Sequence, residues 1–131
     1  MKKPLTTVEE IYGSLGMDAE KNIPDVANCP EEDKDAIIAF AKRLVVTRHL
    51  NNGKKVDWTD PNQRKYFPWD DVVEDKESPL GFRLSFYVSY YAYAFSSLGA
   101  RLHLLSSDMV KFEHEHFRHL KEAMLFEPKS K

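Results

Sequence analysis

The sequence predicts a single α+β domain: two N-terminal helices, a three-stranded antiparallel meander, and a C-terminal helix packed on one face of the sheet. Apolar residues recur at helical intervals as far as residue 50, alternate with period two in GFRLSFYVS, and return to helical spacing near residue 107. A chain of 131 residues is long enough for one hydrophobic core but not for two. We therefore treat residues 1–131 as one domain, with flexible ends at about 1–4 and 127–131.

The first helix is predicted between Thr6 and Gly16. Thr6 and Glu9 have the spacing of a capping box, in which each side chain bonds the backbone amide of the other residue. Gly16 can adopt the left-handed conformation that ends a helix. Apolar residues lie at helical intervals between these two ends: Val8, Ile11, Tyr12 and Leu15.

The second helix is predicted from Pro30 to about Leu50. Proline is favoured in the first turn of a helix, and the acidic residues that follow suit the positive end of the helix dipole. The segment 51–53 contains two asparagines and a glycine, which favour termination. The predicted core-facing side comprises Ile37, Phe40, Ala41, Leu44, Val45 and Arg48.

Strand periodicity begins beyond Val56. Phe82, Leu84, Phe86 and Val88 alternate with more polar residues, which is the pattern of a half-buried strand. The segment 66–73 is predicted to pair with it, and the segment 100–105 to add a third strand. The strand is expected to end near Tyr90 or Tyr91, and residues 90–97 remain open between strand and loop.

The last helix is predicted to begin at Ser107 or Asp108, either of which can cap it, and to run to about Phe126. Pro128 follows and cannot continue it. At ~100° per residue, the predicted core-facing residues share one side. They are Met109, Phe112, Leu120, Ala123 and Met124, flanked by Val110 and Phe117.

This helix contains FEHEHFRH, residues 112–119, with three of the five histidines of the chain. A His-Glu-x-x-His zinc site requires a second histidine four residues after the first, on the same side of the helix. The residue four after His114 is Arg118, so the motif is broken. Both residues are expected to point away from the core.

Two other pairs in this stretch have closer spacing. Glu113 and His116 are predicted to face the core as a hydrogen-bonded structural pair. Glu115 and His119 lie one helical turn apart on the rim, where they are weak candidates for a surface metal. We predict no catalytic residue, no dedicated metal site and no cofactor.

Composition limits the class of protein further. Apolar residues make up 42% and charged residues 31%, which is typical of globular domains. Cys29 is the single cysteine and excludes an intrachain disulfide. No apolar run approaches the ~18 residues that a membrane span needs, so we predict a cytoplasmic protein without membrane contact. Basic residues gather between residues 42 and 65, between two acidic segments.

Aromatic and basic residues are concentrated in the predicted sheet and the segment before it. Stacking aromatics beside cations are used by sheets that bind single-stranded nucleic acid. The same aromatics also serve core packing or a protein interface, which we place first and second. The candidates for a binding surface are Trp58, Arg64, Lys65, Tyr66, Trp69, Arg83, Tyr87, Tyr91 and Arg101.

The order of three segments resembles a family of uncharacterised small bacterial proteins found in prophage-like or mobile-element gene clusters. The segments are IPDVANCPEEDKDAIIAFAKRLVVTRHLNNG, VDWTDPNQRKYFPW and LGARLHLLSSDMVKF. The resemblance covers most of the chain from Ile23 and implies a shared fold, without an activity or a catalytic residue. The histidine-rich stretch departs from that family.

The leading functional hypothesis is a non-catalytic protein-interaction or accessory module, whose partner is another protein or a second copy of the chain. One alternative is a binder of single-stranded nucleic acid that uses the aromatic and basic sheet face. A second alternative is a metal-dependent enzyme centred on the last helix, which the broken motif disfavours.

Overall fold

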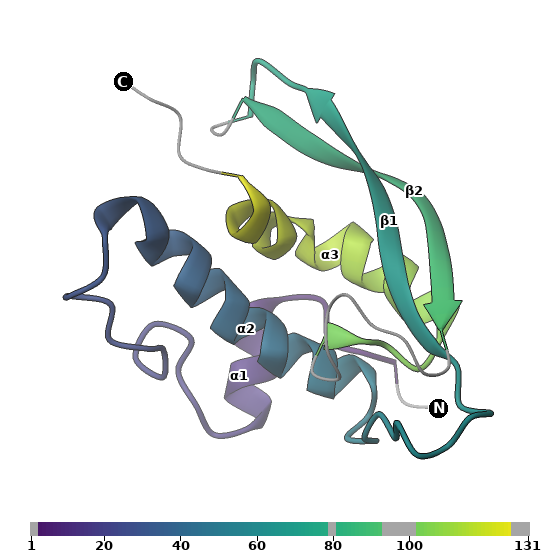
Figure 1. Ribbon diagram of the computed structural model, residues 1–131. Coiled ribbons are helices and arrows are strands. Elements are labelled where there is room, and N and C mark those ends of the chain that lie inside the picture. The colour runs from purple at the N-terminus through teal and green to yellow at the C-terminus, as the bar shows by residue number, and fades with distance from the viewer. Residues whose placement is uncertain (1–2, 79–80, 93–101, 127–131) are drawn as a thin grey trace.

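The computed structural model describes residues 3–78, 81–92 and 102–126; for Tyr87, Val88, Tyr90 and Ala92 it describes the backbone only. The fold is α+β, with an antiparallel hairpin followed by a C-terminal helix, as predicted. Figure 1 shows α3 lying between α2 and the hairpin, with α1 against α2. The elements are α1 (Val8–Ser14), a 3-10 turn (Glu31–Asp33), α2 (Lys34–Leu50), β1 (Lys65–Glu74), β2 (Phe82–Ala92) and α3 (Ser107–Leu125).

The N-cap of α1 is Thr7, one residue later than the sequence spacing indicated. The Thr7 hydroxyl oxygen accepts the amide hydrogen of Glu10, and the same hydroxyl donates to the Glu10 carboxylate at 2.8 Å. Thr6 and Thr7 are each followed by a glutamate three residues later, so the spacing alone does not show which threonine is the N-cap. Gly16 has φ of +71°, the left-handed conformation predicted for the helix end.

α2 buries a side that shares Val45 with the predicted one but is otherwise different. Its fully buried residues are Ala39, Arg43, Val45, Val46, Thr47 and Leu50. Phe40, predicted to face the core, is 41% exposed, while Ile37 and Leu44 are half-buried. The helix carries apolar residues on two sides, and the buried side is the one that contains Arg43.

The described sheet has two strands instead of the predicted three. Tyr66 pairs with Tyr91 and Val72 with Leu84, and a bulge interrupts the register between Trp69 and Asp70. Residues 100 and 101 of the predicted third strand lie outside the described residues. So do residues 93–97, part of the stretch 90–97 for which the prediction was open between strand and loop. Leu104 forms a single antiparallel bridge with Tyr66, with N–O distances of 2.7 and 3.0 Å.

α3 is capped by Ser106, whose hydroxyl oxygen accepts the Asp108 amide hydrogen at 3.2 Å. Its fully buried residues are Val110, Glu113, Phe117, Leu120 and Lys121. Two of them, Glu113 and Lys121, are charged. The helix packs on two sides at once, against α2 and against the hairpin. The described helices include none that is long and apolar enough to cross a membrane.

The side of α3 predicted to face solvent lies under the hairpin. The Leu84 amide donates to the Glu122 carboxylate at 2.7 Å, and Arg118 donates to the Leu84 carbonyl at 3.5 Å. The ring of His114 packs against Phe86, with centroids 5.5 Å apart. Polar side chains of α3 thus bond backbone groups of β2 that a neighbouring strand would otherwise occupy.

Candidate functional site

The predicted binding-surface residues do not form one exposed face. Lys65 is fully buried: its ammonium donates to the Asp60 carbonyl at 2.9 Å and lies 5.3 Å from the centre of the Trp58 ring. The Trp58 ring meets His103 edge-on at 5.4 Å, and Phe67 contacts the same histidine. Trp58 and Lys65 therefore hold the segment before β1 in place, and the buried Lys65 offers no surface to a ligand.

A second group lies at the open end of the hairpin. The Arg64 guanidinium is 4.6 Å from the centre of the Tyr91 ring, and this ring is 5.9 Å from that of Tyr66. Tyr66 packs against the hydrophobic core, whereas Trp69 is exposed. Because side chains alternate along a strand, Tyr66 and Trp69, three residues apart, lie on opposite faces of β1.

The remaining binding-surface candidates, Arg83, Tyr87 and Arg101, extend neither of these two groups in the described structure. Arg83 lies 3.7 Å from the Asp75 carboxylate near the hairpin turn. The side chain of Tyr87 and the whole of Arg101 are outside the described residues. The aromatic and basic set is thus divided between the loop, the core and two faces of the hairpin.

The histidine-rich stretch also differs from prediction. Glu113 is buried but pairs with Arg43 of α2 instead of His116, with 3.1 Å between Nη2 and Oε1. His116 is exposed and packs on Phe112, with ring centroids 4.4 Å apart. The described residues contain no group of three or more His, Cys, Asp or Glu side chains that could hold a metal ion, so Glu115 and His119 gain no further ligand there.

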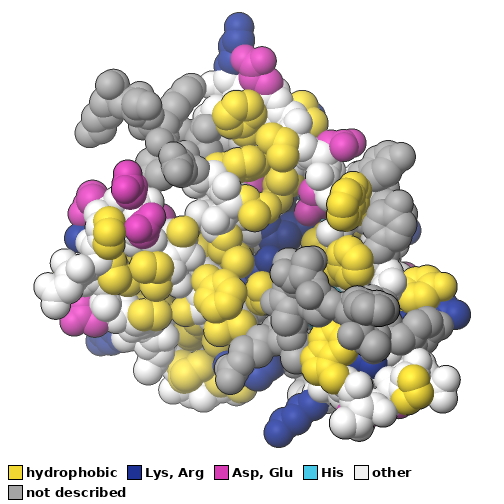
Figure 2. Space-filling model, viewed as in Figure 1, with side chains coloured by type: hydrophobic (Ala, Val, Ile, Leu, Met, Phe, Trp, Pro, Cys, Tyr) yellow, Lys and Arg dark blue, Asp and Glu magenta, His cyan; other side chains and the backbone are white. Residues whose placement is uncertain are grey.

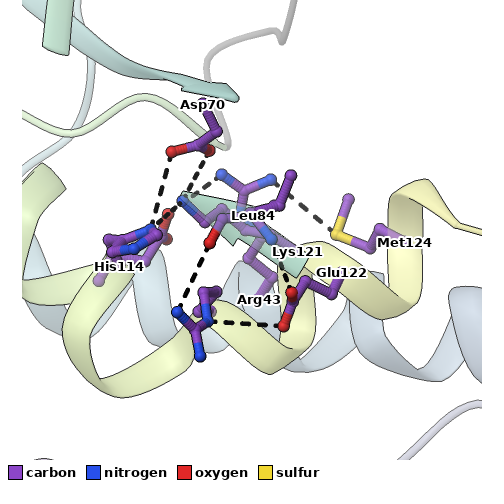
Figure 3. Close-up of polar contacts among 9 residues, drawn as sticks. Arg43, Asp70, Leu84, His114, Lys121, Glu122 and Met124 are labelled. Carbon is purple, nitrogen blue, oxygen red and sulfur yellow. Dashed lines mark hydrogen bonds and ion pairs between the residues drawn. The ribbon is translucent and has the colours of Figure 1, made fainter. Parts of the chain in front are cut away.

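Two buried ion pairs connect α3 to its neighbours (Figure 3). Arg43 reaches Glu113, and its other guanidinium nitrogen lies 3.9 Å from the sulfur of Met124. Farther along α3, Lys121 donates to the Asp70 carboxylate of β1 at 2.9 Å. Both pairs are almost completely buried, so each charge depends on its partner for solvation.

His114 lies beside the second pair. Its Nδ1 is 3.7 Å from the Asp70 carboxylate and 3.4 Å from the Lys121 ammonium. Burial lowers the pKa of His114, and Lys121 lowers it further, while Asp70 acts in the opposite direction. The neutral ring is therefore favoured, and the cluster balances one ammonium against one carboxylate.

The outer face of α2 belongs to the side of this helix that was predicted to face the core. Ile37, Phe40 and Leu44 lie along it, and an open groove of about 400 Å³ runs past Ile37 and Phe40 to Met124 of α3. Figure 2 shows hydrophobic side chains along this helix between acidic side chains near its start and basic ones near its end. Leu125, 64% exposed, adds apolar surface at the end of α3.

A second pocket, of about 370 Å³, lies at the C-terminal end of α2. Among the described residues that line it, three are cationic, namely Arg48, Lys54 and Lys55, and none carries a carboxylate. Asn51 also lines it, but its amide is already bonded to the backbone of His103 and Leu105. The pocket is therefore suited to an anionic group.

Comparison of the chain with protein-family models, curated proteins and solved structures gives no match. The outer face of α2 includes an exposed aromatic side chain, that of Phe40, beside an apolar groove.

Burial lowers the pKa of His49, His114 and His119. His49 also accepts the Leu5 amide hydrogen at Nε2, 3.0 Å away, which requires that nitrogen to be unprotonated. Near pH 6.5, the native protein thus binds fewer protons than the unfolded chain. The contribution of these histidines to the free energy of unfolding is complete above that pH and is lost as the pH falls.

We predict that the free energy of unfolding decreases between pH 7.5 and pH 5.5, and that His49→Gln makes this decrease smaller. Glutamine keeps a hydrogen-bond acceptor for Leu5 but does not titrate. Urea unfolding of both proteins at the two pH values measures the effect. Equal decreases in the two proteins would show that His49 does not contribute.

We predict that Arg43→Met lowers the free energy of unfolding by about 3 kcal/mol, because the Glu113 carboxylate remains buried without its partner. The double variant Arg43→Met, Glu113→Leu should recover to within ~1 kcal/mol of the unchanged protein, since no charge is then left unpaired. Urea unfolding at pH 7.5 measures both. Additive losses in the double variant would contradict the coupling of the pair.

Proposed function

We propose that this protein is an interaction module that binds a protein partner through the outer face of α2, defined by Ile37, Phe40 and Leu44. The observation that supports this most directly is the exposure of Phe40 beside a groove that Ile37 and Met124 also line. An aromatic side chain in an apolar groove is a typical anchor of a protein interface. An accessory role in a mobile-element setting agrees with the resemblance of the sequence.

The composition of the face also supports binding of a helix. α2 spans 17 residues, about 25 Å at ~1.5 Å per residue, and its apolar side chains recur every three or four positions. An amphipathic helix recognises such a surface through side chains at the same spacing. The groove beside Phe40 is bordered by Met124, whose flexible thioether can adapt to the shape of a partner.

We predict that a photo-crosslinking residue in place of Phe40 captures a protein partner in cells that express the full chain. A matched variant carries the crosslinker in place of Lys111, an exposed residue of α3 outside this face. Illumination followed by gel electrophoresis and mass spectrometry identifies the captured chain. The proposal expects a defined product at position 40 and none at position 111.

The outcome against the proposal is the absence of any crosslinked protein at position 40 in a variant whose circular dichroism matches that of the unchanged protein. Equal capture at positions 40 and 111 would count against it as well, since it would indicate non-specific proximity. The size of the product separates a second copy of the chain from a different protein.

A second candidate function is the binding of single-stranded nucleic acid, supported by the cationic pocket at the end of α2. Arg48, Lys54 and Lys55 supply three positive charges there, and Arg64 stacked on Tyr91 offers the pairing of cation and aromatic ring that such binders use. The division of the other aromatics between two faces is the reason for ranking this function second.

We predict for this second candidate that a fluorescently labelled oligonucleotide binds at low salt and dissociates as salt rises, because phosphate contacts release counterions. Lys54→Glu with Lys55→Glu should abolish the anisotropy change, whereas Lys111→Glu with Lys76→Glu, an equal change of charge elsewhere, should not. No change in anisotropy at low salt for the unchanged protein would eliminate this candidate.

A further inference from the structure

We infer that the partner of the outer face of α2 is a second copy of the same chain, with the two α2 helices antiparallel. This inference rests on the proposed function, because it names the occupant of the same face. It is carried by the order of charged and apolar side chains along that face.

The outer face forms a narrow stripe with opposite charges at its ends. At ~100° per residue, five residues fall within about 80° of the helix circumference. In chain order they are an acid, three apolar residues and a base: Asp33, Ile37, Phe40, Leu44 and Arg48. The two charged residues are both exposed, and about 22 Å of helix separates them at ~1.5 Å per residue.

This stripe is complementary to itself in one orientation only. Antiparallel helices bring Asp33 of one copy to Arg48 of the other, and Ile37 of one to Leu44 of the other. Both pairs are centred on the same point of the helix, between Phe40 and Ala41. A single two-fold axis at this point therefore forms each pair twice, once in each direction. The two Phe40 rings then meet beside the axis. Parallel helices would place like charges together and would be disfavoured.

The two charged ends are available for this pairing. Among the described residues, neither Asp33 nor Arg48 forms an ion pair. Asp33 stands at the N-cap position of α2, yet its side chain makes no capping hydrogen bond. The nearby Glu31 differs, because it is bound to Lys34 at 2.8 Å.

The expected dimer is weak. A stable interface buries about 800 Å² on each partner. The stripe of one helix, with Met124 beside it, offers less than this, so we expect a dissociation constant in the micromolar range. Sedimentation velocity of the full chain over micromolar to millimolar concentrations measures it directly.

Charge exchange tests the orientation. Asp33→Arg and Arg48→Asp should each weaken the dimer by ~10-fold or more, because each substitution affects both symmetric pairs and replaces attraction by repulsion. The double variant Asp33→Arg, Arg48→Asp restores opposite charges in the same register. It should return the dissociation constant to within ~3-fold of that of the unchanged protein.

Asp35→Arg is the matched control for Asp33→Arg. It makes the same charge change in the first turn of α2, but its side chain lies about 200° around the helix from Asp33. Its dissociation constant should stay within ~2-fold of that of the unchanged protein. Circular dichroism of each variant shows whether the fold is retained.

Each outcome has a distinct meaning. A chain that stays monomeric throughout the concentration range overturns the inference, and capture of a different protein at position 40 would then leave the proposed function standing. Dimerisation without recovery in the double variant overturns the antiparallel register. A monomeric chain with no crosslinked partner at position 40 overturns the inference and the proposed function together.

Discussion

The buried pair of Arg43 and Glu113 is the interaction on which the arrangement of the helices depends. A guanidinium and a carboxylate taken out of water must remain within hydrogen-bonding distance of each other, or the protein loses several kcal/mol. At 3.1 Å, the pair fixes both the rotation of α2 and its position along α3. The second pair, Lys121 with Asp70, fixes the hairpin against α3 in the same way.

The rotation of α2 explains why an apolar face remains outside. The buried side, centred on Ala39, Arg43 and Val46, and the stripe through Phe40 are separated by about 130° around the helix. A helix of this kind cannot bury both sides against one neighbour. Because Arg43 must meet Glu113, the side with more aromatic surface is the one left exposed. The core thereby determines the location of the candidate interface.

Local signals made most of the element bounds predictable. Capping residues, glycines with positive φ and the switch of period between helix and strand depend on neighbours in sequence, and they located both long helices and both strands within a few residues. The orientation of faces was less predictable. An arginine on a helix normally marks the solvent side, and only a glutamate 70 residues away reverses that expectation. The predicted pairing of Glu113 with His116 was wrong for the same reason: a tertiary partner replaced a local one.

An exposed apolar helix face favours non-specific association unless something restricts its partners. The charged ends of α2 supply that restriction. Apolar contacts at Ile37, Phe40 and Leu44 provide attraction that depends little on orientation, whereas Asp33 and Arg48 favour one direction and one register. Exposed charges add little affinity, but they discriminate against parallel or shifted pairings, in which like charges meet. An apolar centre with charged ends is what a specific but reversible contact requires, and it follows from the order of four residues of α2 and its N-cap residue, Asp33.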